Sequence, residues 1–260
     1  MKKLKVVLAY SAVLILLTSC ETLKVAHYGT HSEKIKKVTI LSVMIDKINQ
    51  PALPLIDAGI FNGKTNSIAE EIMVLQQEYT NEHRHILATS FENHFNCVVR
   101  YGDSLHNHPE YANLMAEFNM PGELYTGNNN FPMIAISDGD ISPFVFNNEN
   151  VKNYFLSETN YKPVLGKIAE KLNSDFIAIA YSFLGVQTVG MFGASGKLVL
   201  YTTLYIFNSE GVLVSKAQNI SDALNVKGDD PESYALTLKK YSAILEPMML
   251  ELETKYKSKQ

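Results

Sequence analysis

Two histidines separated by one residue are the strongest candidates for metal chemistry in this sequence. His106 and His108 can share a face where the chain is extended, because side chains two residues apart in a strand point the same way. Together with Glu110 they would supply three ligands of the kinds that zinc binds in proteins. Histidines that are simply solvated in a loop are the alternative, and this is the interpretation we favour. We therefore predict no metal site and no cofactor.

Two carboxylates flank a glycine at Asp138-Gly139-Asp140. This spacing occurs inside calcium-binding loops, but the third acid and the closing glutamate of such a loop are missing here. An acidic turn explains the same residues without an ion, because aspartate and glycine are both favoured in turns. We expect an acidic turn.

Four glycines lie in the segment from Gly185 to Gly196. A glycine-rich loop that holds phosphate must lead into a helix, whereas this segment leads from one predicted strand to another. The segment is therefore predicted to be a flexible connection. Because its apolar side chains have no obvious core partner, we assign partner contact to them as a hypothesis: Val189, Met191 and Phe192.

Nucleophilic catalysis has two candidate residues, and neither is accompanied by a recognisable base. Cys97 lies in an apolar, strand-like run and is expected to be buried, and Ser195 lies in Gly193-Ala194-Ser195-Gly196. The Gly-x-Ser-x-Gly motif of a nucleophile elbow does not occur in the sequence. We predict that the protein is not an enzyme. The alternative is a periplasmic hydrolase of unknown substrate.

The elements that would position these residues follow from the apolar periodicity of the chain. The last helix should start at Pro231 behind an Asp230 cap and bend at Pro247. The turn at 208–211 should place Gly211 at a positive φ. Strands are predicted at 37–46, 97–101, 175–184, 197–207 and 212–220, with a possible strand at 133–137. Helices are predicted at about 67–96 (one or two), 111–118, 164–172 and 230–257.

This order of elements predicts an α/β domain over residues 36–257, with a single mixed β-sheet flanked by helices. A long irregular insertion is expected at about 102–149, where prolines, glycines and asparagines interrupt any period. Both faces of the strand over Asp175–Leu184 are apolar, so this strand should lie in the middle of the sheet. Ile177 and Ile179 should then face one layer of helices, and Phe176 and Ala178 the other.

The amino terminus has the organisation of a secretory signal. Three lysines in the first five residues precede an apolar run from Val6 to Leu17, which is shorter than the ~20 residues that a membrane-spanning helix needs. The run ends in Leu17-Thr18-Ser19-Cys20, which resembles the bacterial lipobox. The resemblance implies removal of residues 1–19 as a signal peptide and acylation of Cys20. Residues 20–35, polar and mixed, are predicted to be a lipidated tether.

The net charge of the chain, its cysteines and the residues after Cys20 limit its expected partners and location. The chain is acidic, with a formal charge of −4, and it has no basic run, so nucleic acid is not an expected partner. Once Cys20 carries lipid, Cys97 has no cysteine left to pair with, which excludes an intramolecular disulfide. Glu21 stands where an aspartate resembles an inner-membrane retention signal, and no acidic run follows Cys20. We therefore expect a lipid anchor in the outer membrane, facing the periplasm.

Two stretches resemble a group of cell-envelope proteins. Gly166–Ala180 resembles a helix-to-strand step, and Lys197–Ser221 a long strand, an Asn-x-x-Gly turn and a return strand, that are shared by the curli-secretion lipoprotein, the lipoprotein activators of penicillin-binding proteins and the amino-terminal domain of TolB. The resemblance implies a non-enzymatic module in the cell envelope that binds an envelope protein or associates with itself. The insertion at 102–149 departs from the pattern of this group.

The predicted contact residues of the 185–196 segment lead to a direct test. Replacing both Met191 and Phe192 with serine should abolish partner capture or self-association and leave thermal unfolding intact, because exposed apolar groups contribute to contacts and little to a core. Differential scanning calorimetry and cross-linking on membranes would measure the two effects. Ser195→Ala, at the edge of the same segment, is the matched control and should change neither. A large fall in melting temperature of the double variant would place these residues in the core instead.

Overall fold

The computed structural model arranges the chain around one mixed sheet, and it describes residues 23–28, 34–49, 65–118, 134–142, 158–189, 195–225 and 231–257. Within these ranges the strands are β1 (Lys24–His27), β2 (Lys37–Asn49), β3 (Val98–Arg100), β4 (Ile134–Ile136), β5 (Phe176–Val189), β6 (Ser195–Asn208), β7 (Leu213–Ile220) and β8 (Leu224–Asn225). The helices are α2 (Thr65–Phe95), α3 (Gly102–His106), α4 (Tyr111–Phe118), α6 (Glu158–Leu172), α7 (Pro231–Leu238) and α8 (Tyr241–Lys257). The predicted α/β class with a single mixed sheet is confirmed.

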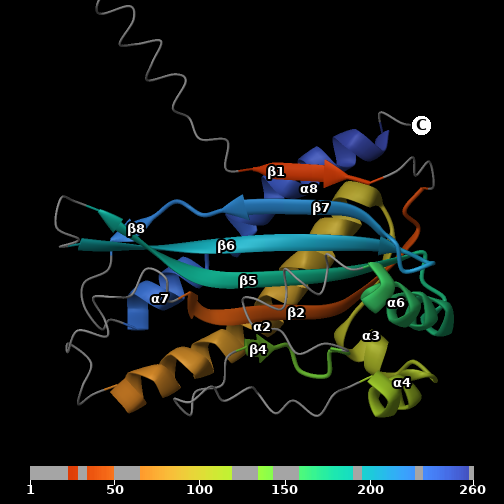
Figure 1. The fold of residues 1–260 in the computed structure, drawn as a ribbon, viewed down its shortest axis with the longest axis horizontal. Coiled ribbons are helices and arrows are strands. Elements are labelled where there is room, and N and C mark those ends of the chain that lie inside the picture. Colours follow the sequence, from red (N-terminus) through yellow and green to blue (C-terminus); the bar gives the residue numbers. More distant parts are fainter. Residues whose placement is uncertain are drawn as a thin grey trace, which may run out of the picture.

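The strands follow the order β1-β7-β6-β5-β2-β3 across the sheet (Figure 1). β2 runs parallel to β5 and β3, while β5, β6, β7 and β1 form an antiparallel series. β4 also pairs with β2, antiparallel, and β8 pairs with the start of β6. Because β5 occupies one side of β2, β3 and β4 share its other side. Within the described part of the chain, the sheet therefore ends in β1 at one edge and in β3 and β4 at the other.

Two layers of helices bury the two faces of this sheet (Figure 1). One face carries Phe176, Ala178 and Ala180 of β5 and packs against α2, α7 and α8. The other face carries Ile177, Ile179 and Tyr181 and packs against α3, α4 and α6. The predicted alternation along β5 is confirmed, and so is the predicted apolar stripe of the carboxy-terminal helices: Leu238, Tyr241, Leu245, Met248, Leu252 and Tyr256.

Several predicted boundaries were wrong in informative ways. The segment predicted as one carboxy-terminal helix is divided into α7 and α8 by a turn at Lys239-Lys240. α6 begins at Glu158, so Pro163 lies inside the helix rather than before it. Pro163 is the sixth residue of α6, past the first turn where proline is tolerated, so it lacks an N–H for the helical ladder and crowds the preceding turn, at a cost of ~3 kcal/mol. The pattern over 67–96 forms one helix, α2.

The hairpin between β5 and β6 is longer than predicted. β5 continues to Val189 and β6 begins at Ser195, so the pairing ladder covers most of the segment that was predicted to be a loop. Gly185 is required by packing rather than by flexibility, because a Cβ atom there would lie 2.5 Å from Cε2 of Tyr201. Gly211, in contrast, has the predicted positive φ, 77°, in the turn before β7.

Regular elements also occur where the sequence suggested none. β1 lies inside the segment predicted as a tether and pairs with β7, from Lys24 opposite Gln218 to His27 opposite Ser215. α3 lies inside the predicted irregular insertion, which also contains the predicted helix α4 and, as β4, the strand suggested at 133–137. Among the described helices, none is both long and apolar enough to cross a membrane.

The central position of β5 predicts the effect of a single truncation. Ile179 is fully buried, so Ile179→Ala should lower the free energy of unfolding by ~2–5 kcal/mol through lost apolar contacts and a residual cavity. Urea denaturation followed by circular dichroism would measure the loss. Val98→Ala in β3 is the control, because Val98 is 70% exposed and should change stability by less than about 0.5 kcal/mol. Equal effects of the two changes would contradict the assignment of β5 to the core.

Candidate functional site

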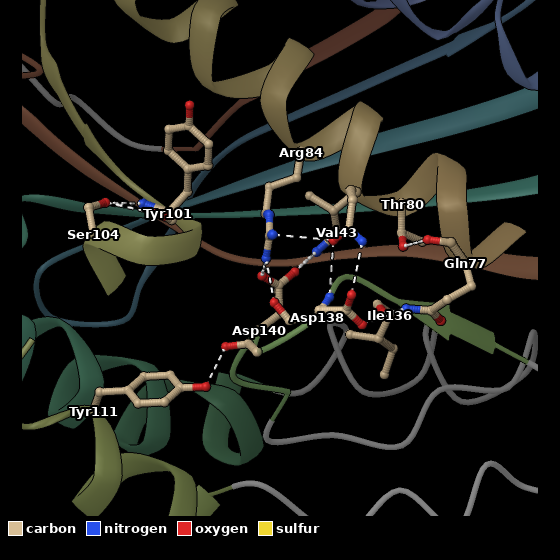
Figure 2. Close-up of polar contacts among 12 residues, drawn as sticks. Val43, Gln77, Thr80, Arg84, Tyr101, Ser104, Tyr111, Ile136, Asp138 and Asp140 are labelled. Atoms are coloured by element: carbon tan, nitrogen blue, oxygen red, sulfur yellow. Dashed lines mark hydrogen bonds and ion pairs between the residues drawn. The ribbon is translucent and has the colours of Figure 1, made fainter. Parts of the chain in front are cut away.

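The turn after β4 is clamped to helix α2 by a polar network (Figure 2). Asp138 accepts hydrogen bonds from Gln77 Nε2 (3.0 Å) and Asn81 Nδ2 (3.1 Å), one on each carboxylate oxygen. Asp140 accepts one from Arg84 Nη1 (2.7 Å) and one from the backbone N–H of Val43 (2.8 Å). Protein groups therefore already satisfy all four oxygens of the two carboxylates. The acidic turn, rather than a calcium loop, accounts for this motif.

The glycine between the two aspartates is required by its own conformation and by its neighbour. Gly139 has φ of 70°, and a Cβ atom there would lie 1.8 Å from Nε2 of His106. The ring of His106 lies against the turn at this point, and the Tyr111 hydroxyl donates to the carbonyl of Gly139 at 2.9 Å. The His106 and Tyr111 rings are 4.9 Å apart. His106 thus packs helix α3 onto the acidic turn.

The three residues weighed as zinc ligands do not form a ligand set in the described structure. Glu110 pairs with Lys171 at 3.1 Å, and Nδ1 of His108 accepts the backbone N–H of Glu110 at 3.3 Å. Burial, followed by the charge of Arg100, lowers the pKa of His108. Within the described ranges, no group of three histidine, cysteine, aspartate or glutamate side chains could hold a metal ion.

Asp140 is a buried charge whose state depends on its partner. Its side chain is fully covered, and that of Arg84 is 12% exposed. Burial raises the pKa of Asp140 to about 7, while the Arg84 guanidinium and the Val43 N–H oppose that rise. Between the ordinary value of 3.8 and about 7, the folded protein holds a proton that the unfolded chain has lost, so this group contributes less stability as pH rises.

His83 is a second buried titratable group, on the opposite face of α2 from the acidic turn. Its ring stacks on Tyr241 of α8 with centroids 3.9 Å apart, and its Nε2 lies 3.0 Å from the carbonyl of Leu238. Burial lowers the pKa of His83 to about 3. The imidazole therefore stays neutral and donates to that carbonyl, which fixes α2 against the junction of α7 and α8.

A polar groove with a volume of about 620 Å³ lies along strand β1. We call it the β1 groove. Figure 1 shows β1 as the outermost strand, with α8 behind β7 and β1. The groove is lined by Leu23, Lys24, Val25, Ala26 and Tyr28 from β1 and its ends, by Lys216 and Gln218 from β7, and by Glu251 and Lys255 from α8.

The β1 groove is basic although the chain as a whole is acidic. Three lysines line it against a single carboxylate, Glu251, whereas the formal charge of the chain is −4. Lys255 bridges its two walls, since its ammonium lies 3.1 Å from Glu251 and donates to the carbonyl of Val25 at 2.9 Å. Lys216 lies over the ring of Tyr205, 5.4 Å from its centroid. No feature of residues 21–35 had suggested this site from the sequence.

The residues singled out from the sequence lie apart from this groove. Val189 ends β5 and Ser195 begins β6, where the two pair, while Cys20, Met191 and Phe192 lie outside the described residues. Cys97 is partly buried, and its thiol donates to the carbonyl of Phe91. Burial raises the pKa of Cys97 to about 11, which disfavours the nucleophilic thiolate.

The Arg84–Asp140 pair predicts a pH-dependent mutant phenotype. Arg84→Met should cost ~3–5 kcal/mol at pH 8, because an unpaired carboxylate stays buried. The cost should be smaller at pH 5, where Asp140 takes up a proton. Urea midpoints at the two pH values would measure the difference. Arg84→Met combined with Asp140→Asn is the control and should recover most of the loss at pH 8. An equal loss at both pH values would show that the charge of Asp140 is not its cause.

Comparison of the chain with known proteins identifies no family. No protein-family model matches the chain, and no curated protein matches it. The solved structures that are distantly similar include two of PelC dodecamers from Paraburkholderia phytofirmans. One of them, a variant with a single substitution, is 11% identical over 88% of this chain and 97% of that chain, with a TM-score of 0.33. The other structure is 12% identical over 88% and 96%, with a TM-score of 0.29. A likeness at this level supports no argument about the function of this chain.

Proposed function

We propose that this protein is a lipoprotein of the cell envelope whose α/β domain is a non-enzymatic binding or assembly module. Acyl chains on Cys20 would hold it in the outer membrane, with the domain facing the periplasm. The observation that carries the proposal is the position of the β1 groove, which begins within four residues of Cys20. An envelope protein is the proposed partner, with self-association as the alternative.

The anchor follows from the amino-terminal sequence. The lysines, the apolar run and Leu17-Thr18-Ser19-Cys20 have the order and spacing of a lipoprotein signal. One acyl chain gives only marginal membrane attachment, whereas several acyl chains on one residue hold a protein stably. Removal of the three lysines with the signal peptide would leave a mature chain that is more acidic than the full sequence.

The short spacing between the anchor and the sheet links location to binding. Four residues of extended chain span at most ~14 Å, so Lys24 cannot lie farther than that from the acylated cysteine. The β1 groove would then stay close to the membrane surface, where it meets partners that are themselves held in the envelope. Such confinement raises the effective concentration of a partner without any additional contact.

The lining of the β1 groove suits a binding role. It combines apolar side chains, such as Leu23 and Val25, with ammonium groups and one carboxylate. Groups of these kinds hold a ligand by contact and charge, which is what an assembly module requires. Val189, Met191 and Phe192, the contact residues predicted from the sequence, remain our second proposed contact surface.

Cell fractionation tests the anchor. Cys20→Ala should release the protein from the membrane fraction after a high-salt wash, because no acyl chain can then be attached. Immunoblots of membrane and soluble fractions would measure the distribution. Cys97→Ala is the matched control, since it removes the only other cysteine and should leave the protein in the membrane. Retention of the Cys20→Ala protein in washed membranes would refute the lipid anchor.

A further inference from the structure

We infer that the β1 groove binds an acidic, extended peptide segment that adds to the sheet as a strand beside β1. The inference deepens the proposed function, and it rests on that function because it names the chemistry of the partner at the same site.

The backbone of β1 presents one edge to β7 and the other edge to the groove. The N–H of Tyr28 donates to the carbonyl of Val214 at 2.9 Å, which fixes Tyr28 as a residue whose polar groups face β7. Backbone groups of successive residues in a strand alternate in direction, so Lys24 and Ala26 also face β7 and Val25 faces away. Within the described part of the sheet, no strand pairs with this outer edge.

The outer edge of β1 already accepts one hydrogen bond, which comes from Lys255. Its ammonium donates to the carbonyl of Val25, at the position that the N–H of an added strand would occupy. An incoming strand would replace this hydrogen bond with its own, and Lys255 would then be available for a carboxylate of the ligand. Glu251, one turn earlier on α8, would keep Lys255 in the groove through their present ion pair.

The groove also has the second wall that such a ligand needs. An edge strand with a helix beside it is the arrangement by which several domains bind an extended peptide, with backbone hydrogen bonds giving affinity and alternate side chains giving specificity. Here β1 supplies the edge and α8 supplies the wall, with Glu251 and Lys255 on it.

Charge selects the class of peptide. Lysines on an edge strand normally prevent unspecific strand pairing, because an added apolar strand would have to bury them. A peptide with carboxylates removes that obstacle, since Lys24 and Lys255 would pair with them. The basic groove of an acidic chain therefore fits an acidic peptide and rejects a basic one.

Binding of defined peptides to the full protein, purified from membranes in neutral detergent, tests the inference. The probe is a short fluorescent peptide that alternates glutamate and valine, and polarisation gives its affinity. A peptide that alternates lysine and valine should bind at least about tenfold more weakly. Two N-methylated versions of the peptide, one methylated at odd and one at even positions, should behave differently. Only one set of alternate N–H groups faces β1, so methylation of that set should abolish binding and methylation of the other set should not. Equal binding of both methylated peptides would overturn strand addition.

Variants of the protein test the same contacts from its side. Val25→Pro removes an outward N–H without touching the ladder to β7, so it should abolish binding, whereas the control Val25→Ala should retain it. Lys24→Gln with Lys255→Gln should weaken binding about tenfold, as expected for two exposed ion pairs. If Val25→Pro fails to fold, the methylated peptides still decide the question.

Three further outcomes distinguish peptide binding at the β1 groove from a lipid-headgroup site and from failure of the proposed anchor. Vesicles containing phosphatidylglycerol should leave the bound peptide in place, and displacement of the peptide by them would show a lipid-headgroup site and overturn the inference. If the protein is anchored as proposed but does not bind the peptide, the peptide inference is wrong and the proposed anchor still stands. Peptide binding by a protein that is not retained in washed membranes would support the groove and contradict the proposed anchor.

Discussion

The burial of strand β5 on both faces is the constraint on which the rest of the structure depends. Phe176 and Ala178 must be covered from one side, and Ile177 and Ile179 from the other, because each is fully or almost fully buried. A strand of this kind is stable only between two layers of helices. The long helix α2 and the carboxy-terminal helices cover one face, and α6 with the small helices after β3 covers the other.

The polar groups of the interior serve the same arrangement. Arg84 and His83 project from successive positions of α2, one to the acidic turn after β4 and the other to the junction of α7 and α8. Both groups are costly to bury, and correct packing provides a partner for the Arg84 guanidinium and for Nε2 of His83, whereas Nδ1 of His83 has no hydrogen-bond partner. Burial makes Asp140 harder to keep charged and His83 harder to protonate. Their contributions to stability therefore change with pH in opposite directions between about pH 4 and 6.5.

The sequence predicted the parts of the fold that periodicity and turn chemistry determine. The alternation along β5 and β6, the glycine of the turn before β7 and the stripe of α8 all depend on neighbours within a few residues. Strand β1 could not be predicted, because four mixed residues carry no period and form a strand only through pairing with β7, nearly 200 residues later. The roles of Gly139 and Gly185 were missed for the same reason, since each is set by a ring from a distant segment. The β1 groove depends on both ends of the chain and left no local signal.

The contact between Lys255 and Val25 joins residues 230 positions apart. Strand β1 is thus completed by a segment that leaves the ribosome much later. β1 has neither its pairing partner nor its helix until β7 and α8 have emerged, so the domain cannot fold progressively from its amino terminus. Contacts of such long sequence separation are formed slowly. During synthesis, β1 would stay unpaired until β7 and α8 have followed.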